Sequence, residues 1–389
     1  MSDSTPTPPA DSESQVDQPS ERLLSLDVYR GLVMLLLATT GLGLAKAAAK
    51  IDSPLARFVH FQGTHPEWNS QFGFLGVSIW DLIQPAFMFI VGVSMPFSYE
   101  KRARLGQSYG QRLRHAWVRA ILLTLLGVFL QSLYKKDTYW IFTNVLSQIG
   151  LGYGFLFFFV GKSWRTQFLA GGIILVGYYL LMLLLPRDLE DWRQHFANGP
   201  SFPQQFDVWF LNLFPREKPF EGHAYATLNF VPSLVTMLMG LMCGQVLKDK
   251  SLSDGTKVKR LAISAAALLL VGAIAGVTIC PVVKKIWTPS WALFSGGYVV
   301  GLLALFYWVI DIRKWNRWVF PFVVVGLNPL TMYLLGMISK RFVRDNLHRH
   351  LPDLVFAGPA APVVEACLIA ILFWLVLYWM YRNRIFLRL

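Results

Sequence analysis

Residues 261–280 read LAISAAALLLVGAIAGVTIC, a run of consecutive positions without a charged side chain. A helix rises about 1.5 Å per residue, so about 20 such residues cross the roughly 30 Å hydrocarbon core of a bilayer. Apolar runs of this kind lie near residues 26–45, 79–99, 115–133, 143–160, 168–185, 229–247, 261–280, 289–310, 318–338 and 362–381. The sequence therefore predicts an all-α integral membrane protein, a bundle of about ten transmembrane helices.

The composition agrees with this fold class. Of the 389 residues, 54% are hydrophobic and only 15% are charged, which is more apolar surface than one water-soluble core can bury. The net charge of +13 is carried mainly by short loops between apolar runs, a pattern typical of membrane orientation and not of nucleic-acid binding. The three cysteines are far apart, which argues against a metal site and against a disulfide framework.

The distribution of basic residues predicts the orientation. An even number of spans puts both termini on one side of the membrane. Lysine and arginine concentrate after the second, sixth and eighth runs, at Lys101, Arg102, Arg104, Arg112, Arg114, Lys248, Lys250, Lys257, Lys259, Arg260, Arg313, Lys314 and Arg317. Such loops are cytoplasmic by the positive-inside rule, so we expect both termini in the cytoplasm. The longer segments 46–78, 186–228 and 339–361 then lie outside and carry six of the seven histidines.

The chain divides into two unequal parts. Residues 1–20 are rich in Ser, Pro, Asp and Thr and lack an apolar signal-peptide core, so they predict a disordered cytoplasmic tail. Residues 21–389 form one polytopic transmembrane domain. The stretches on either side of the 186–228 loop show no internal period, which does not favour an inverted-repeat transporter.

Asp27 and Arg30 stand at the cytoplasmic start of the first run, three residues apart and therefore on one helical face. Placing a charged side chain inside a bilayer costs at least about 2.5–3.5 kcal/mol of free energy, so a charged residue at such a position is expected to have a structural or functional role. A guanidinium suits the phosphate of a ligand, and Arg30 is a candidate for this role together with Arg102. A structural ion pair at the interface is the alternative.

His65 lies in the first outer segment, and Asp81 follows at the outer start of the second run. A histidine titrates near neutral pH, so it can take a proton from an amine or hydroxyl, or attack a thioester itself. The carboxylate of Asp81 could orient that imidazole or hold a cationic acceptor. A solvated loop histidine and a helix-capping acid are the plainer alternatives.

Amide and indole side chains at the helix ends are further candidates. These amides either line a site or form hydrogen bonds that hold neighbouring helices together; they are Asn144, Gln148, Asn229 and Asn328. Trp68, like other tryptophans of the outer segments, suits stacking on a sugar ring, although tryptophan also marks any membrane interface.

Several segments of the sequence resemble one known family. They are RLLSLDVYRG (22–31), HPEWN (65–69) and DLIQPAFMFIVG (81–92), followed in the same order by VLSQIG (145–150), TLN (227–229), WTPS (287–290), NPLTMY (328–333) and YRNRIF (381–386). In these segments, which cover nearly all of the chain after the tail, the protein resembles the heparan-alpha-glucosaminide N-acetyltransferase family of membrane acyltransferases, including its bacterial members. Thr39 and Thr40 stand where the family commonly has an asparagine, and Gln148 where it has an arginine.

The resemblance implies transfer of an acetyl group from cytoplasmic acetyl-CoA to the amine of a terminal glucosamine, with a histidine of the outer loop as the key residue. His65 occupies that position, and we expect Asp81 to orient it. The residues expected to hold the donor are Asp27, Arg30, Arg102, Asn144 and Gln148. Those expected to hold the acceptor are Trp68, Asn69, Asn229 and Asn328. No metal is expected.

The sequence thus predicts an acyl-CoA-dependent N- or O-acetyltransferase in a bacterial inner (plasma) membrane. Its expected partners are acyl-CoA, an amino sugar or glycan, and the lipid bilayer; nucleic acid is not expected, and a homodimer is a further candidate assembly. The hydrocarbon core that separates donor and acceptor is about 30 Å thick. Either the donor nucleotide therefore binds inside the helix bundle, or the outer site lies below the outer membrane surface. The competing hypothesis is a transporter or flippase of an envelope sugar or lipid. A third hypothesis is a catalytically degenerate family member that binds its ligands without catalysing a reaction.

Overall fold

The computed structural model of the protein describes residues 23–65, 68, 77–187, 189, 191–222 and 224–387. The predicted tail 1–20 and the candidate Asn69 lie outside these residues. Within the described ranges the chain forms helices and no β-strand, which confirms the all-α prediction.

Within the part of the chain that the structure describes, seven helices are long and apolar enough to cross a bilayer. Each coincides with one of the runs predicted above. They are α4 (Ile79–Arg104), α5 (Tyr109–Ser132), α7 (Trp164–Leu184), α9 (Phe230–Lys248) with the preceding turn Thr227–Asn229, α10 (Asp254–Thr278), α11 (Pro289–Phe306) with the π-helical turn Tyr307–Ile312, and α15 (Ala361–Arg382).

Two further runs fold as broken helices. After α1 (Leu24–Thr39) the backbone takes positive φ angles at four successive residues from Thr40 to Gly43, and the continuation to Ala48, which ends in α2 (Leu44–Ala48), is bent by 63°. A second break of 87° lies at Asn328, where α12 (Phe320–Leu327) gives way to the segment Pro329–His350. Proline lacks the N–H that a continuous helix needs, so the chain turns there.

The predicted count of about ten spans is therefore not confirmed. Among the described residues seven helices qualify, or up to nine if each bent pair is counted as one span. The run predicted at 143–160 forms α6 (Val145–Phe157), which has only 13 residues. The remaining described elements are α3 (Pro54–Gln62), η3 (Trp192–Phe196), α8 (Phe202–Leu211), α13 (Pro329–Leu334), η6 (Leu335–Ser339), α14 (Lys340–His350) and η7 (Asp353–Phe356).

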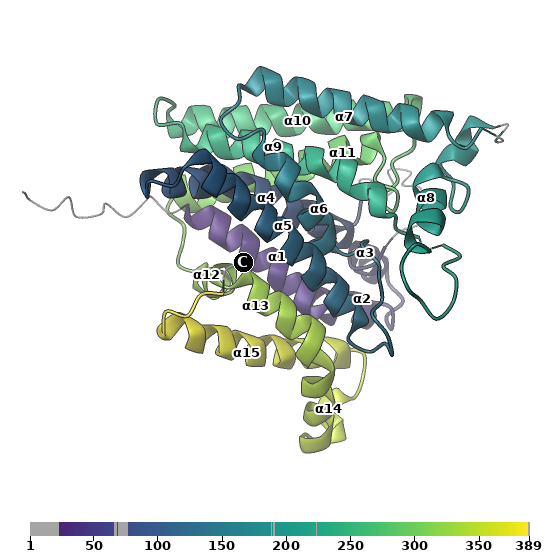
Figure 1. The fold of residues 1–389 in the computed structure, drawn as a ribbon. Coiled ribbons are helices and arrows are strands. Elements are labelled where there is room, and N and C mark those ends of the chain that lie inside the picture. Colours follow the sequence, from purple (N-terminus) through teal and green to yellow (C-terminus); the bar gives the residue numbers. More distant parts are fainter. Residues whose placement is uncertain are drawn as a thin grey trace, which may run out of the picture.

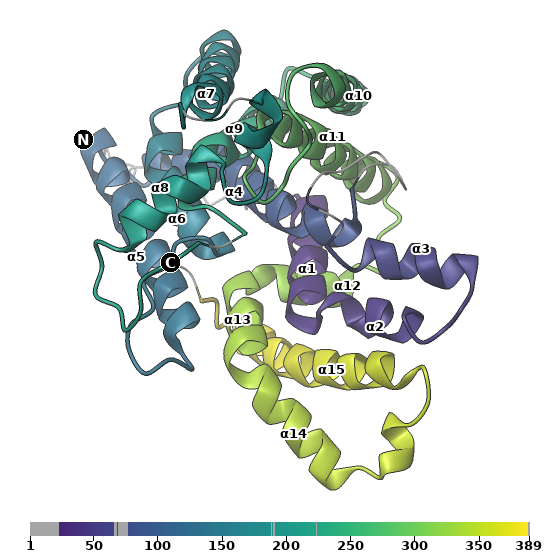
Figure 2. The same ribbon diagram turned by 90° about the vertical axis from the view of Figure 1, so that its right-hand side faces the viewer.

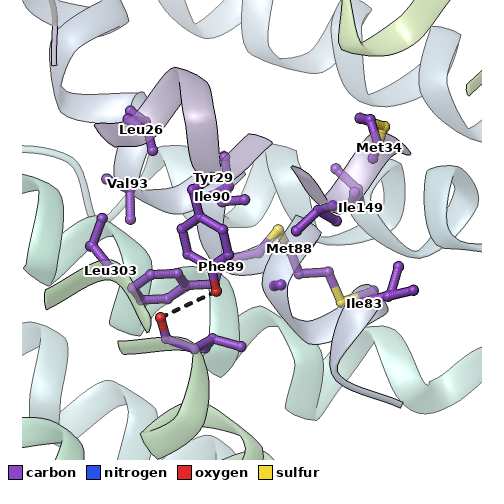
Figure 3. Close-up of a cluster of buried hydrophobic side chains, with 14 of the residues drawn as sticks. Leu26, Tyr29, Met34, Ile83, Met88, Phe89, Ile90, Val93, Ile149 and Leu303 are labelled. Atoms are coloured by element: carbon purple, nitrogen blue, oxygen red, sulfur yellow. Dashed lines mark hydrogen bonds between the residues drawn. The ribbon is translucent and has the colours of Figure 1, made fainter. Parts of the chain in front are cut away.

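The bundle is built around α1, α4, α9 and α11 (Figures 1 and 2). Figure 3 shows the buried Tyr29 surrounded by apolar side chains such as Phe89, and its hydroxyl donates a hydrogen bond to the carbonyl oxygen of Val299 at 3.2 Å. Along one edge lie α7 and α10, whose side chains mostly face outward, and α15 lies along the opposite edge (Figure 1).

Glycines bring α4 and α9 into close contact. A Cβ atom at Gly92 of α4 would collide with the carbonyl oxygen of Met237, and one at Gly240 of α9 would collide with that of Phe89. Small residues at helix interfaces permit this approach in membranes, where packing holds helices together. The two helices run parallel, so both begin at the same end of the bundle, together with α6 and α11. We call this the His65 end.

Candidate active site

Asp81 is fixed in the first turn of α4. Ser78 precedes the helix, and its hydroxyl oxygen accepts a hydrogen bond from the backbone N–H of Asp81 at 3.1 Å. This cap sets where the helix begins and turns the Asp81 side chain inward, where it is only 6% exposed. A buried carboxylate is stable only if it is paired and hydrogen-bonded.

Two side chains supply the partners of Asp81. His65 Nδ1 lies 2.6 Å from the Oδ1 atom of Asp81, and Lys284 Nζ donates to the same oxygen at 2.9 Å. Lys284 comes from the short segment between α10 and α11, and its side chain is 9% exposed. Burial lowers the pKa of Lys284, and the Asp81 carboxylate opposes that shift.

The contacts of His65 determine which ring nitrogen carries the proton. Trp80 Nε1 lies 3.2 Å from His65 Nε2, and an indole N–H can only donate. Nε2 is therefore the acceptor, and the proton of the neutral ring is on Nδ1, from which it is donated to Asp81. The imidazole side chain remains 43% exposed, so solvent reaches it.

Tyr225 completes the surroundings of the imidazole. Its ring centroid lies 6.3 Å from that of His65, and Lys284 Nζ lies 5.8 Å from the tyrosine ring. Burial, reinforced by the charge of Asp81, raises the pKa of Tyr225, which keeps its hydroxyl protonated at neutral pH. A neutral histidine held by a buried carboxylate is an arrangement suited to general base catalysis.

Two of the predicted acceptor residues lie beside this cluster. Trp68 donates from Nε1 to the carbonyl oxygen of Phe196 at 2.8 Å, and Lys285 Nζ lies 5.5 Å from the centre of its ring. Asn229 donates to the carbonyl oxygen of Lys285 at 2.8 Å, while its own Oδ1 is buried without a hydrogen-bond partner. Both residues therefore contact the α10–α11 segment that supplies Lys284.

The sequence context of this cluster identifies the family. A family model described as heparan-alpha-glucosaminide N-acetyltransferase, catalytic, matches residues 22–276, more than half of the chain. The chain belongs to this family. No curated protein gave a match to the chain. The matched residues include His65 and Asp81, whereas Lys284 lies beyond them.

Membership in the N-acetyltransferase family makes the chain a membrane acetyltransferase in general terms. Asn144 and Gln148, predicted to hold the donor, lie at the His65 end of this family member. Asn144 caps α6 by accepting from the N–H of Ser147 at 3.0 Å. The fully buried Gln148 donates to the carbonyl oxygens of Phe142 at 2.8 Å and Thr227 at 3.0 Å, so it fastens the segment that precedes α9.

The other predicted donor residues lie at the opposite end. Arg30 Nη1 lies 3.5 Å from Asp27 Oδ1, and Nη2 donates to the hydroxyl of Ser94 at 2.7 Å. Arg102 lies in the last turn of α4. The residues expected to bind the donor are thus divided between the two ends of the bundle.

Asn328, predicted to hold the acceptor, is also away from His65. Its amide nitrogen donates to the carbonyl oxygen of Ile385 at 3.0 Å, and its amide oxygen accepts from the N–H of Leu387 at 2.9 Å. These two bonds fasten the C-terminal segment beside the break between α12 and α13. The neighbouring Gly326 packs directly against the backbone of Asp27, which places this region at the Arg30 end.

Sequence reasoning missed Lys284 and Tyr225. The only sequence signal for Lys284 was the Lys284–Lys285 pair itself, two adjacent cations in a segment on the side where few are expected. Tyr225 carried no comparable signal, since it lies in the long segment 186–228, which is rich in aromatic residues.

Proposed function

We propose that this family member transfers an acetyl group from cytoplasmic acetyl-CoA to the amine of an amino sugar, or of a related glycan, on the extracytoplasmic side of a bacterial inner membrane. The observation that carries the proposal is the oriented His65, with Nδ1 bound to Asp81 and Nε2 accepting a hydrogen bond from the exchangeable indole N–H of Trp80. Family membership supports the reaction class.

In this proposal His65 acts as general base. An amine that approaches Nε2 replaces the indole N–H of Trp80 as its hydrogen-bond donor. As the amine nitrogen forms a bond to the thioester carbonyl carbon, Nε2 takes the amine proton. The carbon–sulfur bond then breaks, and the sulfur leaves as CoA thiol after receiving a proton from the imidazolium. Proton transfer by a positioned base contributes about 10²- to 10⁴-fold in rate.

Asp81 and Lys284 act by holding the base. The carboxylate fixes the imidazole tautomer and stabilises the imidazolium as it forms. Lys284 balances the charge of Asp81, so the carboxylate stays ionised in a buried place. The imidazole can then remain neutral, with its Nε2 lone pair available, until the acceptor arrives.

The Arg30 end has groups that fit the phosphates of the donor. In the first half of α5, Arg119 donates from Nη1 to the Tyr153 hydroxyl at 3.3 Å, and its guanidinium lies 4.8 Å from that ring centre. The Nε atom of Arg119 is buried without a hydrogen-bond partner. A guanidinium with an unused donor suits a phosphate oxygen, so Arg119 joins Arg30 and Arg102 as a candidate for holding CoA.

The test is acceptor-dependent release of CoA thiol by the purified protein in lipid nanodiscs, with acetyl-CoA and glucosamine. We expect His65→Gln to reduce release by about 100-fold or more. The matched control is His60→Gln, because His60 lies on α3, with Nδ1 3.1 Å from the carbonyl oxygen of Ala45 and no role in the proposed reaction.

Equal release by wild-type protein and His65→Gln would refute the assignment of His65. If the folded protein releases no thiol with any amino sugar, yet exchanges labelled sugar across vesicle membranes without acetyl-CoA, the protein is a transporter instead. Thermal stabilisation by CoA alone would argue against that outcome, because a sugar transporter has no reason to bind CoA.

A further inference from the structure

A cavity of about 310 Å³ lies beside the α10–α11 segment that supplies Lys284. It is bounded by η3, which follows α7, and by the C-terminal end of α10 with the segment after it. Val283 lines the cavity, and the next residue is Lys284, whose ammonium binds Asp81. The proposed mechanism does not use this space.

One wall of the cavity is aromatic and basic. It contains Trp68, Trp192 and Arg193. The guanidinium of Arg193 lies 5.9 Å from the Trp192 ring, and Lys285 Nζ lies 5.5 Å from the Trp68 ring. Indole faces bind the C–H faces of sugars, and two cations beside them attract an anionic substituent.

Another part of the lining is aliphatic and belongs to an exposed apolar face, which suits contact with lipid. It contains Gly276, Val277 and Ile279 at the end of α10, and the side chains of Val277 and Ile279 are 71% and 48% exposed. Only 22% of the apolar part of α10 is buried, and α10 lies on the outer edge of the bundle (Figure 2). The cavity therefore joins a polar headgroup region to hydrocarbon.

We propose that this cavity holds the headgroup of a lipid-linked amino sugar that carries a phosphate, with the lipid chain lying along α10. The proposal rests on the proposed acetyl transfer and specifies its acceptor. Trp68 and Trp192 stack on the sugar, Arg193 and Lys285 bind the phosphate, and the amine points toward His65 past Val283 and Lys284. A soluble sugar would use only one wall of the cavity.

Binding is measured first, without any acyl donor, by native mass spectrometry of the full chain in nanodiscs. The probes are hexadecyl glucosaminyl phosphate, hexadecyl glucosaminide without phosphate, water-soluble glucosamine 1-phosphate, and phosphatidylglycerol. We expect the first probe to bind best, and Trp192→Ala or Arg193→Gln to weaken it by about 10-fold.

The chain offers a matched control at the other end of α7. Arg165 lies 5.6 Å from the ring of Trp164, the same kind of pair as Arg193 and Trp192 but outside the cavity. Trp164→Ala and Arg165→Gln should change binding less than about twofold. Trp192 is 46% exposed, so its replacement leaves the fold intact.

Each contrary result has a distinct meaning. Equal, Arg193-dependent binding of glucosamine 1-phosphate would refute the lipid part of the proposal, and equal competition by phosphatidylglycerol would refute the sugar part. Binding that is indifferent to both cavity variants would refute the proposal as a whole.

Transfer is then measured with acetyl-CoA on the lipid-linked and the soluble amino sugar. In Arg193→Gln we expect kcat/KM to fall about 10-fold for the lipid-linked acceptor and less than about twofold for glucosamine, which has no phosphate for Arg193 to bind. If neither sugar is acetylated but cavity-dependent binding persists, the acetyl-transfer proposal fails and the lipid-linked sugar site stands. If both are acetylated equally by wild type and variant, the cavity assignment alone fails.

Discussion

The ammonium nitrogen of Lys284 lies 2.9 Å from Oδ1 of Asp81, although 203 positions separate the two residues in the chain. This buried pair ties the α10–α11 segment to the start of α4. Each charge is compensated by the other, so removing one leaves an unpaired buried charge that costs about 3–5 kcal/mol.

We therefore predict that Lys284→Met and Asp81→Asn are each destabilising, and that the double variant recovers part of the lost stability. The thermal unfolding midpoints of the wild type, the two single variants and the double variant, measured in one detergent or nanodisc, give the coupling between the two side chains. Midpoint decreases that simply add would show that the two side chains do not interact.

A second prediction concerns catalysis by the same cluster. In Asp81→Asn the amide nitrogen can donate to Nδ1 in place of the carboxylate that accepts from it, so the tautomer with its proton on Nε2 becomes accessible. We expect kcat to fall about 10²- to 10⁴-fold, with KM for acetyl-CoA nearly unchanged, because the proposed donor site lies at the Arg30 end. A rise in KM without loss of kcat would indicate that Asp81 contributes to donor binding and not to catalysis.

Much of the fold could be predicted because lipid imposes a simple length rule. Each described transmembrane helix lies on a predicted apolar run, since hydropathy alone decides insertion. The breaks at Thr40–Gly43 and Asn328 lie inside the predicted apolar runs 26–45 and 318–338. The apolar runs continue through both, and what interrupts them is backbone geometry, positive φ angles in one case and a proline in the other.

The site was predictable only where its members are close in sequence. His65 and Asp81 are 16 positions apart and flank one helix start, so their contact could be anticipated. The partner Lys284 could not, because nothing in the sequence says which loop folds over Asp81. Gln148 and Arg30 were grouped as donor-binding residues because of the roles expected for them. They lie near the starts of α6 and α1, and because these helices run antiparallel, the two residues lie at opposite ends of the bundle.

The contact between α4 and α9 gives a third prediction. Gly240→Ala places a methyl group against the carbonyl oxygen of Phe89, and we expect a loss of about 1–3 kcal/mol in stability. Gly172→Ala on α7 is the control, because a Cβ atom there meets no atom within 4 Å. Equal unfolding midpoints for the two variants would contradict the tight α4–α9 packing.

Asp207 of α8 gives a fourth prediction, on pH. Burial raises the pKa of Asp207 from 3.8 to about 7, and its Oδ2 accepts from the N–H of Thr227 at 2.8 Å. Between about pH 4 and pH 7 the folded protein keeps a proton that the unfolded chain has lost, so stability falls as pH rises through this window. The full effect is about 4 kcal/mol.

Asp207→Asn removes this dependence while keeping an oxygen for Thr227. We expect the variant and the wild type to unfold at similar temperatures at pH 5, and the variant to be more stable at pH 8. Asp249→Asn is the control, since Asp249 is exposed and hydrogen bonds from Ser251 lower its pKa. A wild-type midpoint that rises between pH 5 and pH 8 more than that of Asp207→Asn would refute the prediction.

The short α6 supports the segment that surrounds the imidazole. Its 13 residues rise about 20 Å, against a hydrocarbon core of about 30 Å. Gln148 in its first turns binds the segment that ends in Thr227, two residues after Tyr225, which touches His65. The surroundings of the imidazole are thus tied to the start of a helix that is shorter than the hydrocarbon core is thick. In the proposed reaction, the thioester would approach His65 from the Arg30 end alongside this short helix.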